Sequence, residues 1–366
     1  MNKIKYGSIL LLILFISCNT SNELDRTRFM VLDSVVYATE FPNEFILEYK
    51  IETGLDIVGA WSFTIQDSMM IFSTRNNKGL WKFISLPEQI ELGNFLNLGE
   101  GPLEFSSTLS VSDNVRFVKS DGVLYSYIYH FENGKLLKLN ITESLKAKET
   151  IVSVIDDSLP KFLFDFVMLD SGKYFYREIS DTETQQLRYL EKHGDISVNS
   201  NMAKLNEAAL LEGGDFGIMA TMTRYNDRHD KIVEMNFGLN YINLYSVNND
   251  FGKTICVESK LDDIGQIESK ENVDRIFRFS AVRVYDDFFG VLYVNEKNET
   301  YFTSREKYPE ILLFDWGGNP LANIKLQSHI TSFDIDFISK ELYSFDSRTD
   351  EFAKYDIGEI LSVIQK

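Results

Sequence analysis

Histidines are the residues of this 366-residue chain that could act as general bases, and none stands in a catalytic motif. A hydrolase needs a nucleophile, a base and an orienting group that the fold brings together. No histidine belongs to a G-x-S-x-G or H-E-x-x-H pattern, whose spacing places the base beside a serine or a metal. The four are spread along the chain, mostly near predicted turns: His130, His193, His229 and His329. The sequence therefore assigns no catalytic residue.

The glycine-containing segment LGEGPLEF, residues 98–105, has some features of a phosphate-binding loop. Such a loop needs a following helix whose N-terminus faces the anion, together with further Gly or Lys. Here Pro102 removes one amide donor, and strand-like sequence follows. We predict a turn between two repeats, in which Glu104 bonds backbone amides.

Two aspartates and a cysteine are the remaining candidates for metal binding or nucleophilic chemistry. Asp334 and Asp336 share one face of a predicted strand, but no EF-hand spacing surrounds them. Cys256 lies in the strand-like sequence TICV and is predicted to be a small buried apolar group. We expect no cofactor, with a structural calcium ion as the alternative.

Cys18 is the residue whose surroundings indicate a definite chemistry. Lys3 and Lys5 precede an apolar run over residues 9–16 that is too short to span a bilayer, as in a secretory signal peptide. The sequence FISC, residues 15–18, resembles a bacterial lipobox, which implies cleavage before Cys18 and a diacylglycerol on its sulfur. We predict that residues 1–17 are removed and that 18–27 form a lipidated tether. An ordinary signal or a transmembrane anchor is the alternative.

The composition is strongly acidic, with 37 Lys and Arg against 55 Asp and Glu and a formal net charge of −18. Contacts to phosphate backbones need Lys or Arg, so nucleic acid is excluded as a partner. Attachment to a membrane would rest on acyl chains. We expect a monomer in the cell envelope, at the outer membrane, and the sequence leaves open which face it occupies.

Strand-like runs recur along the chain every 50 to 60 residues or so, the length of a propeller repeat. The repeat over residues 279–326 shows the unit: two alternating runs, then ILLFDW, the turn GGNP and a fourth run. Four strands joined by turns form one antiparallel sheet. Including this repeat, there are six units, and the other first strands begin near Ile57, Asn114, Phe162, Gly217 and Ile330.

Each such unit has two apolar faces, so neighbours must stack, and a closed ring leaves no unmatched end. The sequence therefore predicts an all-β fold, a six-bladed β-propeller forming a single domain over residues 28–366. The last unit lacks a fourth strand, and we predict that residues 45–51 supply it and close the ring. Residues 202–212 have helix-forming composition, so a helical insertion is predicted near 200–214. Residues 360–364 are expected to form a short helix or strand end.

Charged residues on the first strands are the candidates for a binding site, because these strands line the channel of a propeller. We predict that four such residues, each on a different first strand, converge on a ligand: Arg116, Asp165, Arg278 and Asp334. Solvation of the channel would also explain polar residues there. The segment TRYNDRH, residues 223–229, is an alternative loop site.

Several segments resemble the TolB-like six-bladed propeller lipoproteins of Bacteroidetes, the BF3164-like family. The similarity is carried by residues 311–321, 341–346 and 352–357, which look like the closing blades of that family. Residues 98–105 are similar to its G-x-G-P-x-E-F signature, and DKIVEM, residues 230–235, is similar to its middle part. The resemblance implies a lipid-anchored propeller and supplies no catalytic residues.

These observations predict a lipid-anchored envelope propeller that binds or scaffolds a protein, peptide or glycan, without catalysis. The alternative is an envelope hydrolase or lyase with its site at the channel mouth, since a fold does not decide a function.

Overall fold

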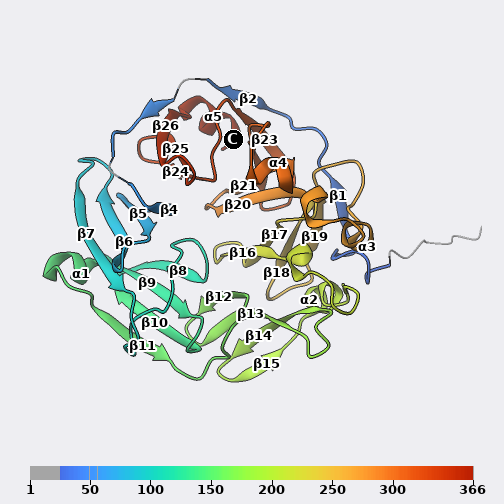
Figure 1. Ribbon diagram of the computed structural model, residues 1–366, viewed down its shortest axis with the longest axis horizontal. Coiled ribbons are helices and arrows are strands. Elements are labelled where there is room, and N and C mark those ends of the chain that lie inside the picture. The colour runs from blue at the N-terminus through green and yellow to red at the C-terminus, as the bar shows by residue number, and fades with distance from the viewer. Residues whose placement is uncertain (1–24, 49, 56, 366) are drawn as a thin grey trace, which may run out of the picture.

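Six small sheets surround a central axis in the computed structural model, which describes residues 25–48, 50–55 and 57–365 (Figure 1). Within each sheet, consecutive strands are antiparallel neighbours, and the first strand of the repeat lies nearest the axis. The predicted six-bladed β-propeller is confirmed.

The blades follow one another along the chain, and their strands run from the axis outwards. Blades 1 to 3 contain β4 (Ala60–Gln66), β5 (Met69–Thr74), β6 (Lys78–Ser85) and β7 (Glu91–Asn97); β8 (Val115–Ser120), β9 (Val123–His130), β10 (Lys135–Asn140) and β11 (Val152–Asp156); and β12 (Asp165–Asp170), β13 (Lys173–Ile179), β14 (Gln186–Lys192) and β15 (Asp195–Ser197). Blades 4 to 6 contain β16 (Thr221–Asn226), β17 (Lys231–Asn236), β18 (Tyr241–Ser246) and β19 (Gly252–Cys256); β20 (Ile276–Val284), β21 (Phe288–Lys297), β22 (Glu310–Asp315) and β23 (Pro320–Leu326); and β24 (Ser332–Asp336), β25 (Glu341–Asp346) and β26 (Glu351–Asp356).

The middle strands of the blades are buried on both faces because neighbouring blades stack against each other. All six residues of β18 are buried, and so are five of the six residues of β5. The inner strand β8 is different, since none of its six residues is fully buried. Stacking therefore explains why middle strands contain nearly continuous apolar runs, whereas the inner strands can carry charged residues toward the channel.

The N-terminal segment, which comprises the described residues up to Glu52, wraps the outside of three blades, as the blue ribbon shows (Figure 1). Its first strand, β1 (Val35–Tyr37), adds a parallel fifth strand to blade 4 beside β19. The next, β2 (Glu44–Leu47), does the same for blade 5 beside β23. The last, β3 (Ile51–Glu52), pairs antiparallel with β26 and completes blade 6. The N-terminal segment thus joins the last blades and closes the ring.

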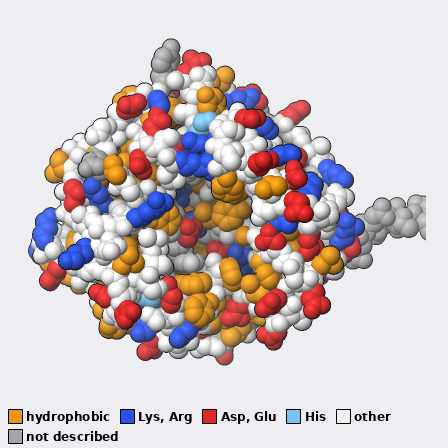
Figure 2. Space-filling model, viewed as in Figure 1, with side chains coloured by type: hydrophobic (Ala, Val, Ile, Leu, Met, Phe, Trp, Pro, Cys, Tyr) orange, Lys and Arg blue, Asp and Glu red, His pale blue; other side chains and the backbone are white. Residues whose placement is uncertain are grey.

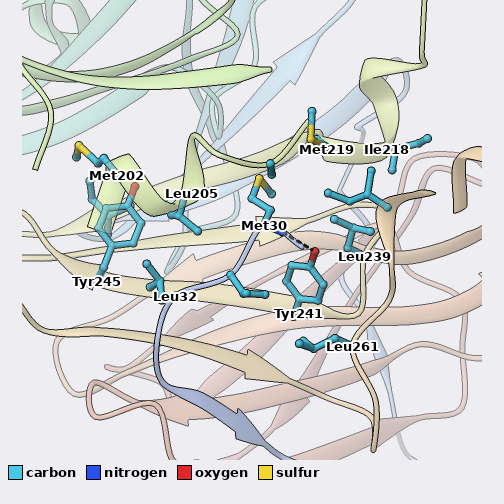
Figure 3. Close-up of a cluster of buried hydrophobic side chains, with 14 of the residues drawn as sticks. Met30, Leu32, Met202, Leu205, Ile218, Met219, Leu239, Tyr241, Tyr245 and Leu261 are labelled. Atoms are coloured by element: carbon cyan, nitrogen blue, oxygen red, sulfur yellow. Dashed lines mark hydrogen bonds between the residues drawn. The ribbon is translucent and has the colours of Figure 1, made fainter. Parts of the chain in front are cut away.

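The start of this segment is buried in the largest apolar cluster, between blades 3 and 4. Met30 and Leu32 are almost fully buried there, beside Leu205 of the insertion (Figure 3). The Tyr241 hydroxyl accepts a hydrogen bond from the backbone N–H of Met30 at 3.2 Å (Figure 3). The Asn243 side chain donates to the Met30 carbonyl at 2.9 Å. The N-terminal segment is therefore part of the core.

The prediction that residues 45–51 form one closing strand is corrected in part. Residues 45–47 belong to β2 on blade 5, and Ile51 begins the two-residue strand β3 on blade 6. The reason is that the open edges of two neighbouring blades do not lie on one line, so the chain must leave the first edge before it reaches the second.

Short helices lie in the connections between strands: α1 (Ile141–Ala147), α2 (Ser200–Leu205), α3 (Ile264–Glu268) and α4 (Asn298–Phe302), with 3₁₀ turns η1 (Phe216–Met219) and η2 (Asn272–Asp274). A further helix, α5 (Gly358–Ile364), follows the last strand, β26. In the insertion near 200–214, α2 begins after the Asn199 cap and ends at Leu205, earlier than the composition suggested. At the C-terminus, residues 360–364 form part of α5 and pack into the core.

The segment at residues 98–105 is a turn, as predicted. The Glu104 carboxylate accepts a hydrogen bond from the Gly101 backbone N–H at 2.9 Å. Leu98 and Phe105 form an isolated parallel β-bridge. A Cβ on Gly99 would lie 2.0 Å from Glu104 Oε2, which explains glycine at that position. The His130 ring stacks on Phe105 with 4.7 Å between centroids, so this histidine supports the turn.

Blades 3 and 4 are joined by a fully buried ion pair. Arg188 of β14 donates from Nε to both carboxylate oxygens of Glu234 at 2.9 Å and from Nη2 to Oε2 at 2.8 Å. The Tyr245 hydroxyl also donates to Glu234. Both charged side chains are 0% exposed. Arg188 also donates from Nη1 to the carbonyls of Gln186 at 3.1 Å and Leu205 at 3.3 Å, so contacts with protein groups replace water around the pair.

Candidate ligand-binding site

The inner strands enclose a cavity of about 860 Å³ at one end of the channel. Its walls come from β4, β8, β12, β16, β20 and β24, so every blade contributes. The space-filling view shows the ring hollowed at its centre, where charged and hydrophobic side chains gather (Figure 2). A volume of this size is within the range of small-molecule sites, roughly 300–1,000 Å³.

Arg116 is one of the predicted site residues that the structure places in this cavity. Its guanidinium donates to the carbonyls of Met168, at 3.0 Å, and Leu169 on blade 3. It also pairs with Asp227 of blade 4 at 3.0 Å and lies over the Tyr225 ring, 5.8 Å from its centroid. Arg116 thus extends from blade 2 across two neighbouring blades.

Asp334 is the second predicted residue that lines the cavity. It is buried, and it accepts hydrogen bonds from the Thr64 hydroxyl at 3.0 Å, the Ile65 amide at 2.8 Å and the Tyr285 hydroxyl at 3.1 Å. Burial raises the pKa of Tyr285 well above its ordinary value, and the Asp334 charge adds to this effect. Tyr285 therefore stays protonated and acts as a donor.

The other two predicted residues lie outside the cavity lining. Asp165, at the start of β12, is buried; Thr223 of blade 4 donates to it at 2.5 Å, and Arg177 of the adjacent strand β13 donates to it at 2.6 Å. Burial raises the pKa of Asp165 although Arg177 opposes the shift. Arg278, near the start of β20, pairs with Asp262 at 2.8 Å, while the cavity begins further along that strand at Val282. The structure thus brings two of the four side chains together at this cavity.

The alternative segment, residues 223–229, contributes three further residues to the cavity wall: Thr223, Arg224 and Tyr225, followed by Asp227 at the mouth. Arg224 pairs with Asp113, which lies in the connection before β8 of blade 2, with 3.0 Å between Nη2 and Oδ1. Burial lowers the pKa of Arg224, with Asp113 opposing and the nearby Arg283 charge adding to the decrease. Burial also raises the pKa of Tyr225 to about 12.

Sequence reasoning missed Arg283, Tyr285 and Phe337. Arg283 is buried, and it donates to the carbonyls of Phe333 at 2.8 Å and Phe63 at 2.6 Å, across the seam between blades 6 and 1. The Tyr285 ring meets the Phe337 ring with 5.1 Å between centroids. The available signal was the position of Arg283 near the end of a first strand, with Tyr285 just after it, at the end opposite to Arg278.

The arrangement supports recognition by charge, hydrogen bonding and aromatic contact. The lining combines arginines, aromatic rings and both buried and exposed aspartates. Among the described residues that line it there is no histidine or cysteine.

His229 and Cys256, which were considered from the sequence, are held by packing and hydrogen bonds outside the cavity lining. His229 stacks on Trp316 with 5.3 Å between centroids and bonds the Asp286 carbonyl at 2.8 Å. Cys256 is buried and free, and burial raises the pKa of its thiol to about 11.

Within residues 25–365 as described, no group of three or more His, Cys, Asp or Glu is arranged to hold a metal ion. No helix in that part of the chain is long and apolar enough to cross a membrane. Cys18 and the predicted signal lie outside the described residues.

Comparison with protein-family models and with curated proteins finds no match. Among solved structures, a member of the DUF4221 family from Bacteroides vulgatus is 12% identical with a TM-score of 0.53, over 84% of this chain and 96% of that one. A Bacteroides fragilis protein named as exported is 12% identical with a TM-score of 0.47, over 87% and 89%. A luciferin-regenerating enzyme is 10% identical with a TM-score of 0.43, over 82% and 94%. At these identities the likeness to the DUF4221 structure shows the propeller fold alone, and membership of the TolB-like family stays a prediction.

Proposed function

We propose that this chain is a lipid-anchored propeller of the cell envelope that binds a glycan or peptide at one end of its channel. The observation that carries the proposal is the cavity of about 860 Å³, to which all six inner strands contribute. Ligand sites are typically concave and bring apolar and polar groups together, and this cavity combines aromatic rings with many charged side chains. The anchor and the envelope location rest on Cys18 and the preceding apolar run.

The aromatic residues at the mouth offer the sharpest test. Phe337 is partly exposed, and its ring contacts Tyr285 and also Phe288, with 6.0 Å between centroids. Because truncation of an aromatic anchor commonly costs more than 1 kcal/mol of binding, Phe337→Ala should weaken binding at least about fivefold.

The measurement is binding of the mature protein to an array of envelope glycans and peptides, followed by titration of the strongest ligand. Phe164→Ala is the matched control, because Phe164 is exposed and lies outside the cavity lining. Equal affinities of the Phe337→Ala variant and the unmodified protein would contradict a site at this mouth. Failure of every glycan and peptide to bind would remove the basis of the proposal.

A further inference from the structure

Positive and negative side chains are intermixed along the cavity, and buried Asp334 lies 3.6 Å from Nε of Arg283. Arg283 and Arg224, whose side chains are 8% and 15% exposed, lie in the wall together with Arg116. The aspartates at the mouth are much more exposed, with 72% for Asp227 and 83% for Asp286. The cavity lining thus contains three guanidinium groups, each with an aspartate beside it.

These guanidinium groups keep unused donors. Arg283 donates through Nε and Nη2 to two carbonyls, and its Nε lies 3.6 Å from Asp334. Arg224 donates through Nη1 to the Thr223 carbonyl and through Nη2 to Asp113. Each arginine has five N–H donors. Within the described residues, Nη1 of Arg283 and Nε of Arg224 carry no hydrogen bond, and neither is among the buried polar atoms that lack a partner. Both can therefore serve a ligand.

The two charges also affect each other. Burial lowers the pKa of Arg224, and the charge of Arg283 on the neighbouring blade lowers it further although Asp113 opposes the decrease, so the two cations repel each other. An anion between them would relieve this repulsion. A guanidinium matches the planar geometry of a carboxylate, with parallel N–H donors and a charge that strengthens each bond.

We propose that the channel binds an acidic sugar whose carboxylate contacts Arg224 and Arg283. This inference rests on the proposed binding function and names its ligand class. The rings of Tyr285 and Phe337 provide apolar surface near the mouth for a sugar ring. The exposed carboxylates of Asp227 and Asp286 accept hydrogen bonds from sugar hydroxyls.

A sugar fits this cavity better than an extended peptide does. Peptides bound through their main chain add a strand along an exposed sheet edge. The wall here consists of strand ends that converge from six blades. A peptide could therefore pair with any one strand over only a few residues.

The experiment is calorimetric titration of the mature protein at low salt with trigalacturonate and with its neutral methyl ester. Trigalacturonate should bind, and the ester should bind at least about tenfold more weakly. Arg224→Gln should weaken trigalacturonate binding about 10- to 100-fold, the range expected for hydrogen bonds to charged groups. Arg75→Gln removes the same charge from an exposed position outside the cavity and should leave affinity unchanged.

Folding of each variant is checked by circular dichroism. Asp113, the partner of Arg224, is 42% exposed, so water can solvate its charge after Arg224→Gln. If that variant does not fold, Arg224→Lys keeps the charge without the planar fork and should show an intermediate loss of affinity.

The outcomes separate this inference from the proposed function. Equal binding of the acid and the ester, with sensitivity to Phe337→Ala, would overturn the anionic ligand and leave the binding site. Binding of tri-alanine that depends on Arg224, without trigalacturonate binding, would replace the sugar by a peptide carboxylate. Unchanged trigalacturonate affinity in Arg224→Gln, or no binding of trigalacturonate, would also overturn the inference.

Discussion

Replacing Arg188 with methionine tests how blades 3 and 4 are held together. The substitution removes three hydrogen bonds of 2.8 to 2.9 Å from the Glu234 carboxylate and leaves that carboxylate 0% exposed. Removing one partner of a buried ion pair leaves an uncompensated charge and costs about 3–5 kcal/mol. We expect Arg188→Met to lower the free energy of unfolding by that amount at pH 8.

The cost should depend on pH in a defined direction. Burial alone would raise the pKa of Glu234, but the charge and hydrogen bonds of Arg188 hold it below the ordinary value of 4.5. In the unmodified protein this group therefore stabilises the fold above about pH 4.5, and the contribution is lost as pH falls through the lower folded pKa. Without Arg188, burial should raise the folded pKa of Glu234. In the variant, Glu234 then takes up a proton on folding. The loss in free energy of unfolding relative to the unmodified protein should therefore be smaller at pH 5 than at pH 8.

Urea unfolding of the mature protein at both pH values measures these differences. Arg75→Met is the control, because an exposed surface substitution usually changes stability by less than about 0.5 kcal/mol. The double variant Arg188→Met, Glu234→Leu should recover most of the loss, since apolar residues can replace a buried pair. A cost below about 1 kcal/mol at pH 8, or an equal cost at both pH values, would refute the reasoning.

Four further outcomes are expected. Met30→Ala should lower the free energy of unfolding by about 2–5 kcal/mol in urea titrations, because it leaves a cavity between blades 3 and 4; a change below about 0.5 kcal/mol would show that the N-terminal segment is dispensable. Gly99→Ala should cost about 1 kcal/mol in the same assay, since the new Cβ displaces the Glu104 carboxylate from the Gly101 amide; full stability would contradict this. The Cys256 thiol, whose pKa burial raises to about 11, should react slowly with iodoacetamide at pH 8 in the folded protein and quickly in urea, followed by mass spectrometry; equal rates would be inconsistent with burial. Cys18→Ser should move a folded propeller from the membrane to the soluble fraction, and recovery of only unfolded protein would count against the predicted anchor.

Much of the architecture could be predicted because the strands and turns of each blade leave a repeating pattern in the local sequence. Each repeat alternates apolar runs with turn residues, and strand formation depends mainly on these local features. The first strands accordingly begin within a few residues of the predicted positions, as at Asn114 and Ile330, where β8 begins at Val115 and β24 at Ser332. The turn made by Glu104 was predictable for the same reason, because its partner is three residues away.

The site was predictable only in part, because its members come from distant strands. Residue type and strand position correctly placed Arg116 and Asp334 beside the channel, but they could not show at which end each side chain lies. Register shifts within β20 change which residues face the channel, and Arg278 and Arg283 of that strand lie in different surroundings. The position of a charged side chain along the channel axis therefore depends on how the strands pair and how the ring closes.

The sequence by itself determined the repeated four-stranded unit, the number of blades and the need for an N-terminal strand, because periodicity and a missing fourth strand are local patterns. Tertiary structure decided the rest. It divided residues 45–51 between blades 5 and 6, and it brought Arg224 and Arg283 from neighbouring blades into one cavity. Such choices depend on ring closure, since the position of one blade edge or side chain relative to another is set by how all six sheets stack around the axis.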